Sequence, residues 1–374
     1  MNGIPLVIDN GTGFSKNGFS GENQPRSVFP TLIGHPKYQS ILTNGQGQIR
    51  DYYIGNEAYK LRGILRLGYP IEHGMIKDWE AIEQIWQYTF QDTLRKKPGE
   101  QPVLLTEPPL NPEQKRKKMA EIMFETFNVP AMYVALQGVL SLFASGRTTG
   151  VIVDSGFGVT HVVPIYEGFA ITHAIARIDL AGRDITNYLR RLLRQQGHSL
   201  SSSAELEIVR DVKENFCYIA LDPEKELQLV EKDNNLEKSY QMPDGTTLAL
   251  QKERFLAPEI FFEPQKAGKA LQALPEMIHQ AINKCDVDIR RSLYSNIVLS
   301  GGSTEFYGFK ERLHKELSVM VPEGVEIKII APKERQYSVW IGGSMLSSLD
   351  SFQNNWISHQ EYKEQGANVI LRCF

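Results

Sequence analysis

Short runs of apolar residues along the chain end in turns that contain glycine. The run at residues 4–8 is followed by the turn Asp9-Asn10-Gly11-Thr12-Gly13, and the run at 151–153 by Asp154-Ser155-Gly156-Phe157-Gly158. Another strand-like run follows each turn, at 14–19 and at 159–166. Because the same order of strand, aspartate and spaced glycines occurs twice, the pattern predicts a duplicated hairpin, with one copy in each of two α/β lobes.

Helical periodicity follows these strands. Asp78 is placed to cap a helix whose apolar face includes Ile82, Ile85 and Trp86. Further helices are predicted from Asn111-Pro112 to about residue 127, over 179–196 before Gly197, and from Ser202 or Ser203 through Cys217. The polar, glycine-containing stretch at 38–49 is predicted to be a mobile loop.

The two matched turns suggest phosphate binding. A phosphate approaches main-chain N–H groups closely only where no side chain intervenes, which glycine permits. Asp9 and Asp154 would repel a phosphate directly but hold the waters of a divalent cation, and Lys16 supplies a positive charge. A single Asn-Gly turn is more often only a hairpin turn, whereas the matched pair favours a site that grips a polyphosphate from both sides.

A third glycine turn follows the strand-like run at 297–299. Gly301 and Gly302 give it a flat main chain that suits contact with a purine ring or a ribose. A strand that ends in Gly-Gly is often only a tight turn, so this segment alone does not decide between the two interpretations.

Composition narrows the classes of protein. A formal net charge of −3 over 374 residues gives no general attraction to nucleic acid. The three cysteines, Cys217, Cys285 and Cys373, include no CxxC pair, so neither a zinc site nor a disulfide framework is predicted. A reducing, cytoplasmic compartment is favoured, and no signal peptide or membrane-spanning stretch is expected.

Together, the three turns resemble the two phosphate motifs and the adenosine motif of the actin family. The likeness extends through nearly the whole chain and includes the blocks YPIEHG at 69–74, PVLLTE at 102–107, VPIYEG at 163–168 and RCF at 372–374. Residues 76–79 and 85–88 look more like the dynactin-type actin-related protein, whereas the C-terminal residues look like conventional actin.

By that resemblance, the fold is an actin-like two-lobed ATPase fold, with duplicated α/β domains around a nucleotide cleft. In the first lobe, residues 1–32, 70–144 and 338–374 would form the base subdomain, and 33–69 the small subdomain with the mobile loop. In the second lobe, residues 145–180 and 270–337 would form the base subdomain, and 181–269 the small one. The implied cofactor is ATP or ADP with Mg²⁺ or Ca²⁺.

The resemblance also assigns residues to the site. The implied nucleotide contacts are Gly11, Thr12, Gly13, Phe14, Lys16, Gly156, Phe157, Gly158, Val159, Gly182, Arg210, Lys213, Glu214, Gly301, Gly302, Ser303 and Gln336. Asp9 and Asp154 would hold the metal through water. Gln137 and His161 match the pair that positions the hydrolytic water, a role that fits phosphoryl transfer because positioning matters more than covalent help. Without the resemblance, a polar hinge-helix residue and a satisfied core histidine are the simpler interpretations.

Several departures from the family pattern suggest a specialised relative. Phe157 stands where actins have an aspartate, which predicts weaker metal binding and slow hydrolysis. Gln336 replaces a lysine beside the adenine. The segment 264–269 corresponds to an apolar plug that helps to join filament strands but is polar and basic here, which predicts weak, salt-sensitive self-association.

Another resemblance concerns partners. The set Phe143, Gly146, Thr148, Gly168, Phe169, Ile341, Met345, Leu346 and Leu349 resembles the groove that receives partner helices or a neighbour's loop, and ordinary core packing is an equally good interpretation. The basic run at 115–118 is more simply a solvated helix face. Implied partners are actin-like subunits, self or other, and actin-binding proteins, with no nucleic acid and no membrane insertion.

The predicted function is that of an ATP-binding, cytoskeletal, actin-like protein that assembles with actin-like subunits, with the nucleotide state controlling the angle between the lobes. The alternative is an actin-related subunit of a larger complex that binds nucleotide and hydrolyses it poorly. A sugar-kinase-type phosphotransferase shares the fold, but it needs a catalytic aspartate that faces a substrate pocket, and the sequence shows no such motif. A chaperone of the Hsp70 type would need a further domain.

Overall fold

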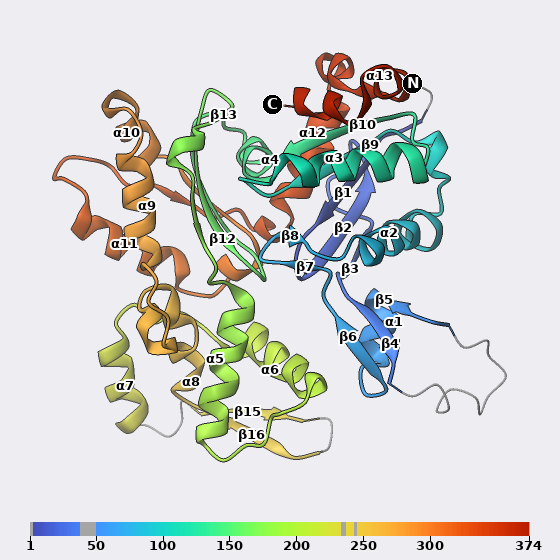
Figure 1. Ribbon diagram of the computed structural model, residues 1–374. Coiled ribbons are helices and arrows are strands. Elements are labelled where there is room, and N and C mark those ends of the chain that lie inside the picture. The colour runs from blue at the N-terminus through green and yellow to red at the C-terminus, as the bar shows by residue number, and fades with distance from the viewer. Residues whose placement is uncertain (1–2, 38–49, 233–236, 243–244, 374) are drawn as a thin grey trace. The chain divides into compact units, whose positions relative to one another are not determined.

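The computed structural model describes residues 3–37, 50–232, 237–242 and 245–373. The chain divides into two compact units, the first made of Met1–Thr149, Ile165–Thr172 and Gln336–Phe374 and the second of Gly150–Pro164 and His173–Arg335. Both units contain helices and sheets, as predicted for an α/β protein (Figure 1). The finer division into four subdomains stays a prediction, and the loop predicted at 38–49 lies outside the described residues.

The first unit is built on a sheet with the strand order β19-β10-β9-β1-β2-β3. Its strands are β1 (Leu6–Asn10), β2 (Phe14–Phe19), β3 (Ser27–Pro30), β9 (Val103–Glu107), β10 (Ala131–Leu136) and β19 (Ile357–Ser358). β1 and β2 form an antiparallel hairpin, whereas β1, β9 and β10 run parallel. The carboxyl ends of the parallel strands therefore meet at one edge, which is where open α/β sheets bind ligands.

Helices pack on both faces of this sheet. Leu6 and Ile8 share one core with α2 (Trp79–Tyr88) and α3 (Glu113–Glu121), while Val7 points to the other face and packs with α4 (Gln137–Ala144) and α12 (Ser338–Ser348). α4 and α12 approach closely at Gly342. A Cβ on this residue would lie only 2.0 Å from the carbonyl oxygen of Leu140. Glycine is therefore required where the two helices touch.

The helix boundaries follow the predicted signals in part. Asp78 caps α2 as predicted, and its carboxylate accepts a hydrogen bond from the N–H of Ala81 at 3.0 Å. α2 and α3 each continue into a π-helical turn, at Thr89–Thr93 and Ile122–Thr126. The helix predicted to reach about residue 127 is thus α-helical only to Glu121, a difference that apolar spacing could not reveal.

The first unit also holds smaller elements. They are a sheet of β4 (Ile33–Pro36), β5 (Tyr53–Ile54) and β6 (Leu65–Gly68) with α1 (Gly55–Lys60), the pair β7 (Ile71–Glu72) and β8 (Met75–Ile76), and α13 (His359–Gln365). Leu32, Ala58 and Leu65 form the small core under the β4-β5-β6 sheet.

The second sheet repeats the arrangement of the first. Its order is β13-β12-β11-β17-β18, with β14 paired to β12, and its strands are β11 (Gly150–Ser155), β12 (Thr160–Tyr166), β13 (Phe169–Ala170), β14 (Ala176–Ile178), β17 (Ile297–Ser300) and β18 (Ile329–Ile330). β11, β17 and β18 run parallel, as β1, β9 and β10 do. The strand before each glycine turn lies between its hairpin partner and two parallel strands, which confirms the predicted duplication.

The remaining helices belong to the second unit. They are α5 (Gly182–Gln195), α6 (Ser203–Phe216), α7 (Pro223–Lys232), α8 (Glu253–Leu256), α9 (Leu274–Asn283), α10 (Val287–Tyr294) and α11 (Phe309–Met320), beside the hairpin of β15 (Lys238–Gln241) and β16 (Thr247–Leu250). Ser202 caps α6 as predicted. α5 was predicted to begin at 179 but begins at Gly182, because Ala181 is extended and its N–H donates to the Asp184 carboxylate at 2.9 Å.

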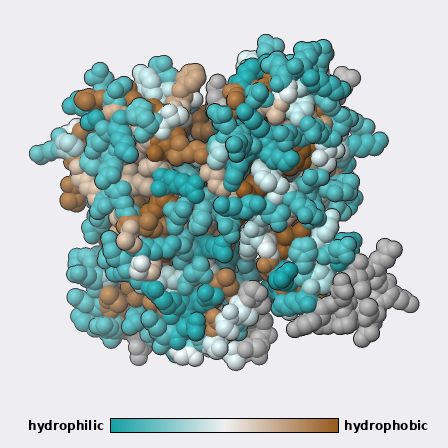
Figure 2. Space-filling model, in the orientation of Figure 1, coloured by the Kyte–Doolittle hydropathy of each residue, from teal (hydrophilic) through white to brown (hydrophobic). Residues whose placement is uncertain are grey.

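The surface and the thiols agree with the composition. In the described part of the chain, no helix is both long and apolar enough to cross a membrane, and hydrophilic residues predominate on the face shown in Figure 2.

The three cysteines are free. Burial raises the pKa of the Cys217 thiol to about 12, that of Cys373 to about 11, and that of Cys285 above its ordinary value.

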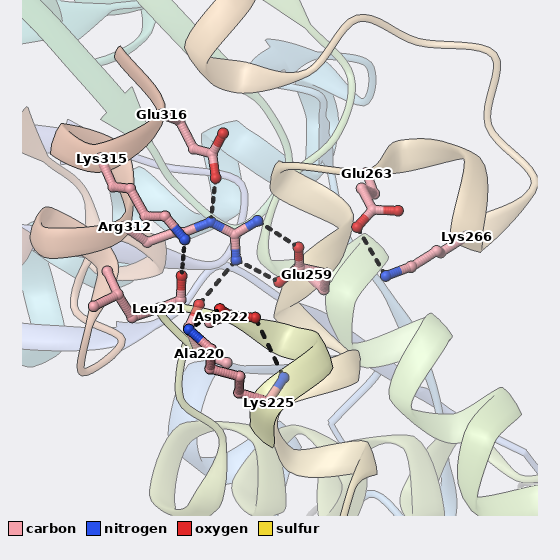
Figure 3. A network of polar contacts seen from close by, with 10 residues as sticks. All are labelled: Ala220, Leu221, Asp222, Lys225, Glu259, Glu263, Lys266, Arg312, Lys315 and Glu316. Atoms are coloured by element: carbon pink, nitrogen blue, oxygen red, sulfur yellow. Dashed lines mark hydrogen bonds and ion pairs between the residues drawn. The ribbon is translucent and has the colours of Figure 1, made fainter. Parts of the chain in front are cut away.

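A buried ion pair ties three segments of the second unit together (Figure 3). The Arg312 guanidinium on α11 donates to both carboxylate oxygens of Glu259, at 3.1 and 2.8 Å, and to the carbonyl oxygen of Ala220 at 2.9 Å. Glu316, one turn further along α11, accepts a fourth bond at 2.6 Å. The Glu259 side chain is fully buried, so its charge depends on Arg312 for compensation.

Replacing Arg312 with Met should destabilise the second unit by about 3–5 kcal/mol, because the Glu259 carboxylate would stay buried without a counter-charge. Hydrogen exchange measures the destabilisation. We expect faster exchange in α11 and in the Pro258–Phe261 turn, and an unchanged exchange rate in the β1–β2 hairpin. The double variant Glu259→Met/Arg312→Met should recover much of the loss. Equal loss in the single and double variants would show that the charge pair is not the cause.

Candidate functional site

The first glycine turn, between β1 and β2, offers unused main-chain donors. The N–H of Gly11 closes the turn on the carbonyl oxygen of Phe14 at 3.0 Å, and the hydroxyl of Thr12 accepts from the N–H of Gly74 at 2.9 Å. Within the described residues, the N–H groups of Thr12 and Gly13 have no acceptor. Both are thus available to an oxygen atom of a ligand.

Asp9, at the end of β1, is the centre of a polar network in the first unit. Its carboxylate side chain is 2% exposed and accepts from Lys16 on β2 at 2.9 Å and from the Thr106 hydroxyl on β9 at 2.6 Å. Lys16 lies directly opposite Asp9 in the hairpin register. A ligand that brings both a cation and phosphate oxygens would offer the carboxylate and the ammonium separate partners.

Gln137 joins this network from the first position of α4. Its amide nitrogen donates to the Asp9 carboxylate and to the Thr106 hydroxyl, at 3.3 Å in both cases. Its amide oxygen accepts no hydrogen bond from the described residues, which leaves it able to orient a water. Gln137 is therefore held beside the first turn, and its predicted role with water stays a prediction.

The second glycine turn, between β11 and β12, is braced from two sides. The N–H of Gly156 bonds to the carbonyl oxygen of Val159 at 3.2 Å. The carbonyl oxygen of Gly156 accepts from the N–H of Gly182 at 3.1 Å and from the Ser303 hydroxyl at 2.7 Å. Gly182 and Ser303 thus support the turn, and the N–H of Val159 is left without an acceptor among the described residues.

The third glycine turn packs directly on the second. Asp154 on β11 is paired in register with Ser300 on β17. Gly301 has a positive φ of 83°, and a Cβ there would lie 2.3 Å from the carbonyl oxygen of Ser155 and 2.8 Å from an Asp154 carboxylate oxygen. No side chain fits at position 301, so close approach of the two turns explains this glycine. The structure brings these predicted residues together within the second unit.

Phe157 lies against two cations, Arg210 and Lys213, that the resemblance assigns to nucleotide binding. The guanidinium carbon of Arg210 lies 5.0 Å from the centre of the Phe157 ring, and the Lys213 ammonium 5.8 Å. Arg210 also pairs with Glu214 at 3.0 Å and with Glu207 at 3.5 Å. Burial lowers the pKa of Lys213 to about 8. An aromatic ring at position 157 therefore provides a cation–π contact where a carboxylate would provide a metal-binding oxygen.

His161 is a buried histidine with an unused nitrogen. The residue lies on β12 and is 1% exposed, and its Nε2 atom has no hydrogen-bond partner in the part of the chain that the structure describes. Burial, helped by the positive charge of Arg177, lowers the pKa of His161 to about 3, so the ring is neutral near pH 7. The orphaned nitrogen argues against the interpretation as a satisfied core histidine, because it leaves room for a bond to a water or a ligand.

The predicted nucleotide residues are divided between the two units. The first turn and Gln336, which is exposed, belong to the first unit, while the second and third turns with Arg210 and Lys213 belong to the second. Among the described residues, no group of three or more His, Cys, Asp or Glu side chains could hold a metal.

The predicted partner groove lies at the surface of the first unit. Phe169 is 77% exposed, Met345 41% and Leu349 40%, and Phe143, Ile341 and Leu346 are half-buried. Gly146 and Thr148 are exposed, and the N–H of Gly168 bonds to the carbonyl oxygen of Thr148 at 2.7 Å. Phe169, Met345 and Leu349 are therefore exposed, whereas Ile341 and Leu346 pack half-buried against the core beside α4 and α12. The binding of partners by this set stays a prediction.

Two residues of the site were not predicted from the sequence. Thr106 could have been found, since it stands near the end of a buried strand-like run, as the aspartates do. Glu207 could also have been found, because it lies three residues before Arg210 in the predicted helix, a spacing that brings the two side chains together.

Residues 3–374, nearly the whole chain, match the family model described as Actin. The matched residues include all three glycine turns, Gln137 and His161.

The neutral, buried state of His161 predicts sensitivity to acid. In the unfolded chain the imidazole takes up a proton near pH 6.5, and in the folded protein only near pH 3. The unfolded state therefore binds more protons between these values, and stability falls as the pH is lowered, by up to about 1.4 kcal/mol per pH unit. Urea unfolding at pH 7 and pH 5 should show a smaller loss for His161→Gln than for the wild type. An identical loss in both proteins would contradict the assignment.

Proposed function

Because the chain belongs to the actin family, we propose that it binds ATP or ADP together with a divalent cation. The observation that carries the proposal is the pair of matched turns with unused donors, at Thr12 and Gly13 in one unit and at Val159 in the other. Main-chain N–H groups of this kind suit phosphate oxygens, because glycine leaves them open to close approach. A nucleotide held by turns from both units would link their relative position to its chemical state.

The residues present fit the cation as well. Asp9 and Asp154 each stand at the end of a strand that leads into a phosphate turn. Carboxylates that hold the waters of Mg²⁺ or Ca²⁺ would let the cation neutralise phosphate charge without direct contact between carboxylate and phosphate. When bound, the cation would polarise the terminal phosphate.

We further propose slow ATP hydrolysis, with Gln137 and His161 positioning the attacking water. The free amide oxygen of Gln137 would accept from that water, and the neutral His161 ring would bind it through the orphaned Nε2. Phe157 weakens the reaction because its ring faces Arg210 and Lys213 and supplies no oxygen to the cation's water shell.

Assembly with actin-like subunits is the proposed cellular role, in the cytoplasm and its cytoskeleton. The exposed apolar residues Phe169, Met345 and Leu349 would contact partners. Lys266 and Lys269, in the polar plug, are paired within the unit, with Glu263 at 2.9 Å and with Asp184 at 2.5 Å. The plug therefore satisfies its charges internally, which favours weak self-association and the alternative role as one subunit of a larger complex.

Gly156→Val should lower ATP affinity at least about a hundredfold, because the branched side chain would occupy the path of the phosphates. The fold has room for it, since a Cβ at 156 meets nothing closer than the Val159 carbonyl oxygen at 4.0 Å. Isothermal titration calorimetry with Mg-ATP measures the loss. Gly63→Val, at a glycine with nothing within 4 Å of a Cβ, is the matched control and should bind normally. Wild-type protein with no heat of binding would refute the proposal.

Phe157→Asp should strengthen the dependence of ATP binding on the cation and raise phosphate release by about tenfold, since the new carboxylate adds an acceptor for the cation's waters. Phe157→Leu removes the ring without adding a carboxylate and serves as the control. Phosphate release is measured under single-turnover conditions with Mg²⁺ varied. If Asp and Leu behave alike at position 157, the carboxylate is not the missing element.

A further inference from the structure

The outer face of α5 carries a polar cavity of about 450 Å³ that is lined by Asn187, Arg190, Arg191, Arg194 and Gln195, here called the arginine face. These positions recur every three or four residues and therefore share one side of the helix. The lining contains three guanidinium groups and no carboxylate. Like charges at this spacing repel and destabilise the helix, and no lining residue carries a negative charge that would offset the repulsion.

The charges on this face are not neutralised by the rest of the described chain. Arg191 donates to two main-chain carbonyl oxygens, those of Lys266 at 2.7 Å and Ala267 at 3.3 Å, and pairs with no carboxylate. Arg190 and Arg194 have no partner among the described residues, and Arg190 is half-buried. The nearest lysines are already paired, Lys266 with a glutamate (Figure 3) and Lys269 with an aspartate. Among the residues that the structure describes, these arginines therefore have no carboxylate partner, and an anionic partner molecule would supply one.

We propose that the arginine face binds an extended, acidic segment of a partner protein. Arg190 and Arg194 are one turn apart, about 6 Å along the helix axis. Alternate residues of an extended peptide lie about 7 Å apart on one side, so carboxylates at alternate positions match the two guanidinium groups. Each guanidinium offers a planar fork of N–H donors that suits a carboxylate in two-point contact.

The two amides at the ends of the cavity favour a peptide over other anions. Asn187 and Gln195 both donate and accept hydrogen bonds, and neither has a partner among the described residues. An extended peptide presents both N–H and C=O groups, whereas a phosphodiester backbone presents only acceptors. A helical partner would have its main-chain groups already bonded. The net charge of −3 also gives the protein no general attraction to nucleic acid or to an anionic membrane.

The test uses the full-length protein and a dye-labelled synthetic peptide of alternating Glu and Ser, followed by fluorescence anisotropy. The double variant Arg190→Gln/Arg194→Gln should bind this peptide about tenfold more weakly or worse. Lys284→Gln/Arg291→Gln removes the same charge from exposed positions elsewhere in the second unit and should change affinity less than about twofold. A peptide with the same composition but adjacent glutamates should bind more weakly than the alternating one, because adjacent side chains point to opposite sides.

Circular dichroism checks that the variants are folded, and three outcomes would overturn the proposal. The first is no binding of the alternating peptide by the wild type, or binding that the arginine variant leaves unchanged. The second is preferential binding of single-stranded DNA or of phosphatidylserine vesicles through the same arginines. The third is loss of self-association in the arginine variant, seen by sedimentation of the protein alone, with no effect on the peptide, since this would assign the face to a second copy of the chain.

Discussion

A carboxylate that is almost removed from water must have its charge balanced, and in this protein that requirement organises the centre of the first unit. Asp9 obtains its partners from the neighbouring strand of its own hairpin, from β9 through Thr106, and from the start of α4 through Gln137. Three elements that are distant in sequence are thereby fixed at the carboxyl edge of one sheet. This network fixes the position of the glycine turn that follows Asp9. It also fixes the Gln137 amide, which is predicted to position a water.

In the second unit the same edge is organised by close packing of main chain rather than by a charge network. The carbonyl oxygen of Gly156 is held from α5 and from the third turn, and Gly301 admits no side chain. Phe157 then turns towards Arg210 and Lys213, so the residue that departs from the family pattern strengthens contacts within the unit. The two halves repeat a topology, yet they stabilise the sheet edges that carry their glycine turns by different means.

Much of this could be predicted from the sequence. The hairpins, the caps at Asp78 and Ser202, and the family itself followed from local patterns, because strand ends, caps and glycine turns depend on neighbouring residues. The π-helical turns, the late start of α5 and the support that Gly182 gives to the second turn did not follow. The support from Gly182 depends on a contact between distant segments, and α5 starts late because the Asp184 carboxylate accepts from the N–H of Ala181, which apolar periodicity does not show. The pairing of Lys269 with Asp184 was missed because these residues are far apart in the sequence, whereas the pairing of Lys266 with Glu263 is local. The roles of the site residues remain predictions.

The burial of the three thiols has a practical consequence for the chemistry of the whole chain. Alkylating reagents and oxidants attack the thiolate, and the raised pKa values of Cys217, Cys285 and Cys373 keep each of them protonated near neutral pH. A cysteine introduced at an exposed position would therefore react faster than the buried Cys285 and Cys373, and Cys217, which is half-buried, is the native thiol whose labelling needs a control. Reporters attached to one introduced cysteine in each unit would then label chosen positions, and the distance between the two reporters would measure in solution how the units are placed relative to one another.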